Sequence, residues 1–302
     1  MNLQFIVDGL LMGGMIGLGA IGVTLTYSIL RFANFAHGEF ITWGTYATLA
    51  VSALIGWATG NHLGTLGPFS FGWPVLLAGV VAMLLTGLLA LALDVVLFSR
   101  LRARSNAIIM VMASFGASMA LRSLLEFIFT SEPKYFSREI QIAMPLGAGI
   151  RVTPDQLLML AITAAFVVGI HIVMTRTTIG RSMRAVSENP QLARVAGVDV
   201  EAVIRATWLA GGALACAAGI MSGITVQVRP FMGFDLLLPL FAAAILGGIG
   251  SVPGAVIGGL VVGLSEAAAV PLVGGGFRAA VAFILLIAVL LVRPTGLFGV
   301  RE

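Results

Sequence analysis

Residues 73–98 read WPVLLAGVVAMLLTGLLALALDVVLF, an apolar run in which Asp94 is the single charged side chain. A helix of about 20 such residues crosses the ~30 Å hydrocarbon core of a bilayer. The whole chain of 302 residues is 59% hydrophobic and 10% charged, whereas soluble domains carry about 25% charged residues. The sequence therefore predicts an all-α polytopic membrane protein, with residues 1–302 forming one transmembrane domain.

Comparable apolar segments recur along the chain, near 5–29, 39–57, 106–129, 154–175, 206–227, 235–249, 252–270 and 277–292. The segment 235–249 is short for a crossing, and Gly247, Gly248 and Gly250 break its pattern. A short helix and a re-entrant one both fit, because irregular backbone at membrane depth is tolerated where protein or a cavity covers it. We expect eight or nine transmembrane helices, with broken or re-entrant segments near 31–39 and 235–254.

Two short segments between the apolar runs are rich in arginine, and short loops of that kind stay in the cytoplasm. They are the connector 99–105, with Arg100, Arg102 and Arg104, and the stretch 176–205, with Arg176, Arg181, Arg184, Arg194 and Arg205. Alternation then places 58–72, 130–153 and the N-terminus on the outer, periplasmic side. We expect a multi-pass protein of the bacterial inner membrane.

Several kinds of chemistry are disfavoured by the residues present. The chain has one cysteine, Cys216, and one lysine, Lys134, which is followed by Tyr135 and Phe136. No GxxxxGK[ST] phosphate loop can be built from that lysine, so any ATP and magnesium would be bound by another subunit. We expect no cofactor, no metal site, no catalytic residues and no nucleic-acid partner in this chain.

The stretch 180–197 has the features of two short helices around a corner. Asn189 is a plausible N-cap with Pro190 at the first helical position, and Gly197 is a natural stop. One interpretation is a solvated, positively charged loop. The capped helices favour the alternative, a docking element for a cytoplasmic partner, whose contact residues we expect to be Arg181, Arg184, Glu188, Asn189, Pro190, Arg194 and Gly197.

The two interruptions of the apolar pattern are candidates for a translocation path, because broken hydrophobic segments in the two halves of a transporter indicate one. The predicted gate residues are Asn34, His37, Gly38, Glu39, Gly247, Gly248 and Gly250. A structural interpretation is equally open for the first group. In it Asn34 caps a helix whose first turn begins near Ala36, and Glu39 complements the dipole of that helix.

Four sequence blocks carry a family resemblance: NFAHGE at 34–39, the loop 180–197, LGGIGSVPGA at 246–255 and RPTGLFG at 293–299. With them the chain resembles the LivH-type permease subunits of branched-chain amino acid ABC importers. The resemblance implies a LivM-like second permease, two LivG/LivF-like ATPases that bind ATP and Mg, and an extracytoplasmic solute-binding protein. It also implies that the loop 180–197 docks an ATPase.

The resemblance leaves the solute open, since related permeases serve urea and short amides. A secondary transporter is a further alternative, and it would need coupling residues at the membrane centre. The candidates are Asp94, Glu126, His171 and Glu266, and we expect Arg122 to neutralise Glu126 one helical turn away.

Overall fold

The computed structural model describes residues 4–60, 64, 66–102, 105–137, 141–147, 149–293 and 295–299. Arg104, in the predicted cytoplasmic connector, lies outside these ranges. The helices are α1 (Gln4–Leu30), α2 (His37–Ala58), α3 (Trp73–Leu93), continued by the π-turn η1 (Asp94–Phe98) and α4 (Ser99–Arg102), α5 (Ala107–Phe129), α6 (Pro154–Arg176), α7 (Thr178–Glu188), α8 (Pro190–Val195), α9 (Val200–Thr225), α10 (Met232–Gly247), α11 (Val252–Val273), the 3₁₀ turn η2 (Gly275–Phe277) and α12 (Arg278–Val292). Two short strands, β1 (Met144–Gly147) and β2 (Ile150–Val152), form an antiparallel hairpin.

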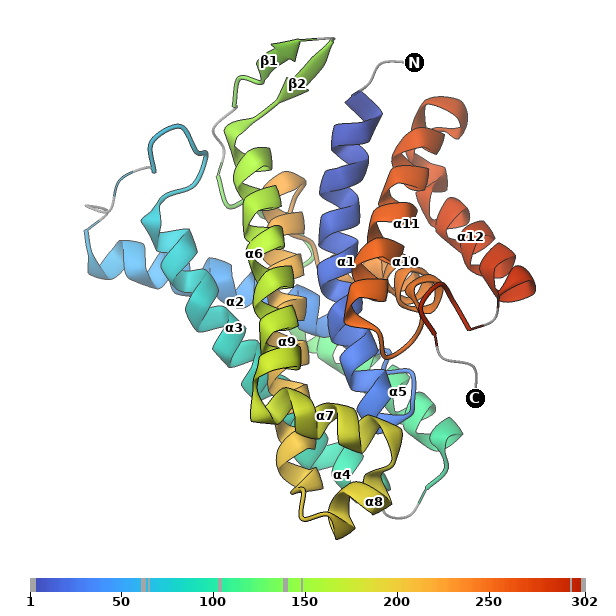
Figure 1. Ribbon diagram of the computed structural model, residues 1–302. Helices are drawn as coiled ribbons and strands as arrows, with labels where there is room; N and C mark the ends of the chain where they lie inside the picture. Colours follow the sequence, from blue (N-terminus) through green and yellow to red (C-terminus); the bar gives the residue numbers. More distant parts are fainter. Residues whose placement is uncertain are drawn as a thin grey trace.

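The bundle has two distinct ends, which Figure 1 shows at the top and the bottom of the view. The β1–β2 hairpin lies beside the start of α1, where the Gln4 side chain donates to the carbonyl of Arg151 over 3.0 Å. We call this the hairpin end. The short helices α7 and α8 lie at the opposite end, which we call the α7–α8 end.

Eight helices within the described ranges are long and apolar enough to cross a membrane. They confirm the predicted polytopic all-α class. The central α1 and α9 are 72% and 67% buried over their most apolar windows, whereas α5, α6 and the η2–α12 unit are only 22%, 11% and 6% buried. Helices so exposed in a membrane protein face lipid or a partner subunit, because their apolar side chains would not be stable in water.

The helix α1 packs against α11 through glycines, with the two helices antiparallel. A Cβ on Gly9 would lie 2.8 Å from the Cα of Leu264, and one on Gly13 would lie 2.7 Å from the Cα of Leu260. Small residues at four-residue spacing allow this close approach of two backbones. The helix α11 therefore starts at the α7–α8 end, where α1 finishes.

The ninth apolar segment, α10, is a short helix that runs through the bundle at a steep angle to α1. Its 16 residues span about 24 Å, and Figure 1 shows it nearly end-on, steeply inclined to α1. The preceding α9 runs antiparallel to α1, because Gly19 faces Ala218 and Gly22 faces the carbonyl of Gly211. It follows that α9 ends at the hairpin end and α11 starts at the other, so the segment between them passes from one end to the other.

The predicted break near 31–39 is a reversal inside the protein. The chain leaves α1 at Arg31, which has a positive φ of 58°, and remains buried at Phe32 and Asn34. It then returns along α1 before α2 begins, since a Cβ on Gly22 would lie 2.7 Å from the ring of His37. The start of α2 therefore lies well inside the bundle.

Candidate functional site

The stretch α7–α8 has the local structure that the sequence predicts. The Asn189 side-chain oxygen accepts from the backbone N–H groups of Gln191 and Leu192, at 3.0 and 2.9 Å. Pro190 begins α8, and Gly197 stands just past its end with a φ of +87°. All seven residues predicted for partner contact are exposed, namely Arg181, Arg184, Glu188, Asn189, Pro190, Arg194 and Gly197.

The apolar residues of this stretch divide into two sets. Met183 and Val186 of α7 are buried against the bundle, at 5% and 2% exposure. Leu192 and Val195 of α8 are 65% and 85% exposed. The helix α7 thus packs against the bundle, whereas α8 exposes two apolar side chains to the outside at the α7–α8 end.

The end of α7 is joined to the end of α1. The Arg31 guanidinium donates to the backbone carbonyl of Ser187. A cavity of ≈ 680 Å³ opens beside this contact, between the ends of α1, α6 and α7 and the turn before α11. Arg184 and Glu188 line one wall and Gly250 lines another. The structure therefore brings part of the predicted docking element and part of the predicted gate to one cavity.

The turn between α10 and α11 depends on its glycines. Gly248 and Gly250 have φ values of +95° and +92°, a region that residues with a Cβ rarely adopt. The Ser251 hydroxyl caps α11 by accepting from the N–H of Gly254 at 3.1 Å. Gly247 packs directly against Gly254, with no room for a Cβ between the two backbones.

The C-terminal segment closes the same turn, a contact that the sequence did not reveal. The N–H of Leu297 donates to the carbonyl of Leu246 at 2.8 Å, and that of Phe298 to the carbonyl of Gly247 at 3.1 Å. These carbonyls belong to the last turn of α10, whose acceptors have no partner within the helix. Two of the sequence blocks that carry the family resemblance are therefore in contact.

The other gate group surrounds the start of α2. The Asn34 side chain accepts from the N–H of Ala36 at 3.1 Å, which is a turn just before α2 and not the expected cap, because Ala36 holds the N-cap position and no side chain caps this helix. His37 is buried against α1. Gly38 packs on α10, where a Cβ would lie 2.7 Å from the carbonyl oxygen of Gly233.

Glu39 pairs with an arginine of another helix. Its Oε1 accepts from Arg122 Nη2 at 2.6 Å, from Arg122 Nε at 3.2 Å and from the Ser118 hydroxyl at 3.0 Å. The guanidinium also lies over the rings of Phe231 and Phe234, 4.9 and 4.3 Å from their centroids. The expected pairing of Arg122 with Glu126 is corrected by this geometry, because the arginine is directed across to α2.

The two gate groups do not lie together. Gly38 contacts α10 at Gly233, near its start, whereas Gly247 forms its end. The fourteen residue steps from Gly233 to Gly247 span about 21 Å in a helix. The helix α10 is therefore the element that connects the two groups.

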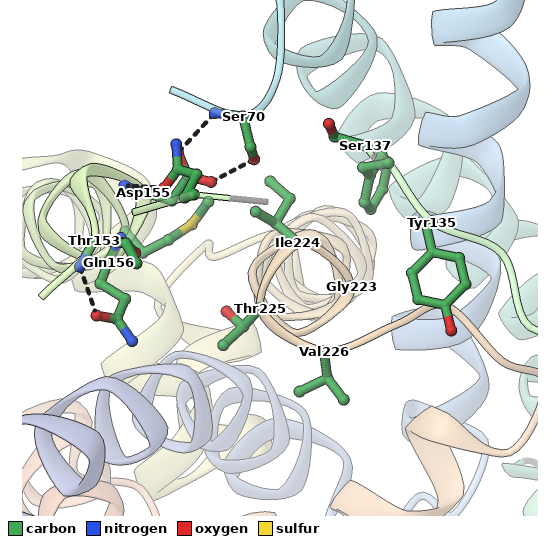
Figure 2. Close-up of a pocket in the computed structure, with 13 residues that line it drawn as sticks. Ser70, Tyr135, Ser137, Thr153, Asp155, Gln156, Gly223, Ile224, Thr225 and Val226 are labelled. Carbon is green, nitrogen blue, oxygen red and sulfur yellow. Dashed lines mark hydrogen bonds between the residues drawn. The ribbon is translucent and has the colours of Figure 1, made fainter. Parts of the chain in front are cut away.

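A second polar site lies at the hairpin end (Figure 2). The Asp155 carboxylate, in the first turn of α6, accepts from the N–H of Ser70 at 3.1 Å and from the Gln141 side-chain amide at 3.0 Å. The Ser70 hydroxyl donates to it as well. These residues line a cavity of ≈ 260 Å³ that reaches the end of α9 at Thr225. The pattern of the sequence did not indicate this cluster, because its members come from two separate loops and the first turn of α6.

The side chains considered for metal binding and for ion coupling have different surroundings in the structure. Among the described residues, no three His, Cys, Asp or Glu side chains lie close enough to hold a metal ion. Of the candidate coupling residues, Asp94 is paired with Arg102, His171 lines the cavity at the α7–α8 end, and Glu266 is buried in α11.

Comparison with known proteins gives a match over nearly the whole chain. The family model described as the permease component of branched-chain amino acid transport systems matches residues 5–290. The chain is 32% identical over 305 residues to the high-affinity branched-chain amino acid transport system permease protein BraD of Pseudomonas aeruginosa, covering 99% of this chain and 96% of that protein. It is 30% identical over 306 residues to LivH of Escherichia coli K12, with the same coverage. Among solved structures, a chain of PsaBC from Streptococcus pneumoniae in complex with Fab matches at a TM-score of 0.49 and 14% identity, covering 97% of this chain and 95% of that one.

Proposed function

The chain belongs to the permease components of branched-chain amino acid transport systems, and from this premise we propose that it is one permease subunit of an ABC importer. It translocates branched-chain or closely related small amino acids across the bacterial inner membrane. The observation that carries the proposal is the family match from residue 5 to residue 290, which spans both breaks and the α7–α8 element.

Partner ATPases supply the energy and dock on α8. This helix is capped by the Asn189 side chain at its start and ends just before Gly197. Its exposed Leu192 and Val195 stand beside Arg194. Apolar anchors inside a polar rim are typical of a protein interface.

The helix α7 transmits movement of the docked ATPases to the transmembrane helices. Its buried Met183 and Val186 tie it to the bundle, and the Ser187 carbonyl holds Arg31 at the point where α1 ends. A displacement of α7 would therefore pull on the α1–α2 reversal that carries Asn34, His37, Gly38 and Glu39. It would also change the cavity whose opposite wall contains Gly250.

The orientation follows from the same assignment. The α7–α8 end is cytoplasmic, with Arg100, Arg102 and the arginines of 176–205 on that side. The hairpin end and the N-terminus are periplasmic, and the solute-binding protein delivers the amino acid there. A LivM-like permease forms the other half of the translocation unit, and two LivG/LivF-like ATPases bind ATP and Mg.

The test is uptake by the complete complex in proteoliposomes, with permeases, ATPases and binding protein present. We expect uptake of labelled leucine that requires ATP and the binding protein. Uptake of urea or acetamide in place of leucine would assign the chain to the amide permeases. Uptake driven by an ion gradient without ATP would assign it to the secondary transporters.

A further inference from the structure

We propose that the Glu39–Arg122 pair, with Phe231 and Phe234, is the intramembrane site that receives the zwitterionic head group of the transported amino acid. The proposal rests on the proposed function, because it specifies which side chains contact the solute. It adds Arg122 and the two phenylalanines to the gate residues expected from the sequence.

The pair lies within the membrane-spanning part of the bundle. Arg122 stands seven residues before Phe129, the last residue of α5, which is about 10 Å along the helix axis. Glu39 is the third residue of α2, the helix that begins beside Gly22 of α1. Ionisable side chains at such depth are costly and usually mark a solute or ion pathway.

The hydrogen bonds of the pair leave it incompletely satisfied. Both Arg122 donors and the Ser118 hydroxyl converge on Oε1 of Glu39. The other carboxylate oxygen, Oε2, is buried and has no partner among the described residues, although buried polar atoms are nearly always hydrogen-bonded. A carboxylate oxygen without a hydrogen-bond partner therefore lies beside a guanidinium.

A zwitterion matches this arrangement in charge. Its carboxylate can form an ion pair with the guanidinium of Arg122 while its ammonium group forms one with the carboxylate of Glu39, so that two ion pairs replace one. The net charge of the site stays the same, and no charge is left unpaired in the membrane, where an unpaired charge is most costly. Urea and short amides carry no charges with which to make this exchange.

The two phenylalanines form the exposed, apolar side of the site. The Glu39 side chain is fully buried, and the Arg122 side chain is 13% exposed. Phe231 and Phe234 are 49% and 40% exposed, and their rings flank the guanidinium. The aliphatic side chain of a branched-chain amino acid would lie on these rings while its head group reaches the ion pair.

The surface around these two rings faces the second permease. The helix α5 is exposed along most of its length, including Phe115 and Met119 on the same stretch as Arg122. An arginine that is partly exposed at membrane depth needs protein or water beside it, because lipid does not solvate it. The second permease supplies that cover and leaves a path between the two subunits.

The same pair couples solute binding to movement of α5. The helix α5 is joined to α2 and the preceding break by polar contacts. The N–H of Phe35 donates to the Ser114 hydroxyl at 3.1 Å, and the Trp43 indole N–H donates to the carbonyl of Leu121 at 3.1 Å. The Glu39–Arg122 ion pair is a further, charged contact between α2 and α5. A zwitterion that takes Arg122 from Glu39 would loosen the contact between the two helices.

The experiment compares single and double neutral variants in the complete complex, with saturating binding protein. We expect Glu39→Gln and Arg122→Gln each to lower leucine transported per ATP hydrolysed by about tenfold or more. Stimulated ATP hydrolysis should stay within about twofold of the wild type. The double variant Glu39→Gln/Arg122→Gln should remain as defective as the single variants, because both contacts to the zwitterion are gone.

The double variant separates the site from a purely structural ion pair. If the pair only stabilises the fold, removing both charges leaves no unpaired charge, and transport should recover toward the wild-type value. That recovery would overturn the proposal. The Asp94–Arg102 pair is the matched control, and its double neutral variant Asp94→Asn/Arg102→Gln should transport normally.

A labelling experiment provides a readout that does not depend on activity. The one native cysteine, Cys216, is buried, so a cysteine introduced by Phe234→Cys can be followed with a thiol reagent. We expect leucine during turnover to slow labelling of Phe234→Cys by about threefold or more, but not of Phe127→Cys, an exposed position on α5. Equal labelling rates with and without leucine would contradict the site. Failure of the wild-type complex to transport leucine would instead overturn the proposed function and this site with it.

Discussion

The backbone N–H of Leu297 donates to the carbonyl of Leu246 over 2.8 Å, so the end of the chain completes the last turn of α10. Leu297→Pro removes this donor, and we expect a loss of about 1 kcal/mol in stability. The denaturation temperature of the purified complex should fall, and leucine uptake should fall with it. Leu297→Ala keeps the N–H group and is the matched control. Equal effects of the two variants would mean that the side chain, not the backbone contact, is important.

The contact between Arg31 and the Ser187 carbonyl predicts a variant that hydrolyses ATP without transport. Arg31→Gly retains the positive φ of this residue without strain but removes the donor. We expect leucine transported per ATP to fall by about fivefold or more, while ATP hydrolysis continues. Arg31→Lys keeps a cation and should retain more coupling than Arg31→Gly. Identical coupling ratios for wild type and Arg31→Gly would exclude this route of transmission.

The positive φ of Gly197, just after α8, predicts that residues which cannot adopt it will uncouple ATP hydrolysis from uptake. Its φ of +87° costs a β-branched residue about 1–3 kcal/mol, so Gly197→Val should displace the end of the docking element. We expect a complex that still inserts but hydrolyses ATP without matching uptake, and the same result for Pro190→Gly. Gly197→Asn tolerates a positive φ and should transport nearly as the wild type. Normal uptake by Gly197→Val and Pro190→Gly would favour the solvated-loop interpretation.

Gly38 and Gly233 bring α2 and α10 so close together that a larger side chain at Gly38 would push the two helices apart, and we expect this to stop transport. A Cβ on Gly38 would lie 2.7 Å from the Gly233 carbonyl oxygen and 2.8 Å from Cγ of Leu237. Gly38→Val should therefore block uptake while the ATPases still co-purify with the permease, and we expect the same of bulky residues at Gly248. Gly169→Val, on α6, is the matched control, since a Cβ there meets open space. Wild-type uptake by Gly38→Val and by a bulky Gly248 variant would mean that both regions serve helix packing and do not form a gate.

The proposed orientation predicts opposite labelling of two introduced cysteines. A membrane-impermeant thiol reagent added to intact cells should label Glu132→Cys, in the 130–153 loop, and should not label Arg181→Cys. After the cells are opened and the ATPases are removed both should react, since both native side chains are exposed in this chain. Labelling of Arg181→Cys from outside would reverse the orientation, and with it the sides assigned to the ATPases and the binding protein.

The transmembrane helices could be predicted closely from the sequence because hydropathy depends on local residues alone. The run at 73–98 corresponds to a continuous helical segment from Trp73 to Arg102. The caps of α8 are local as well, and the roles of Asn189 as N-cap and Gly197 as stop are confirmed. The docking role of these residues stays a prediction.

The contacts of the candidate site could not be predicted in the same way, because they join residues far apart in the chain. Glu39 and Arg122 are separated by 83 positions. A helical spacing rule can suggest only partners such as Glu126, on the arginine's own helix. The passage of α10 was ambiguous for a related reason. Its course is set by where α9 ends and α11 begins, and only the packing of these two helices on α1 reveals that.

The glycine packing between α1 and α11 also limits how this subunit can change shape. Gly259 and Gly263 pack on the backbone of α1 at Gly13 and Gly17 so closely that no sliding layer of side chains separates the two helices. Two rods joined in this way must tilt together as one rigid body. A change of shape during transport is therefore expected in the elements outside this central pair.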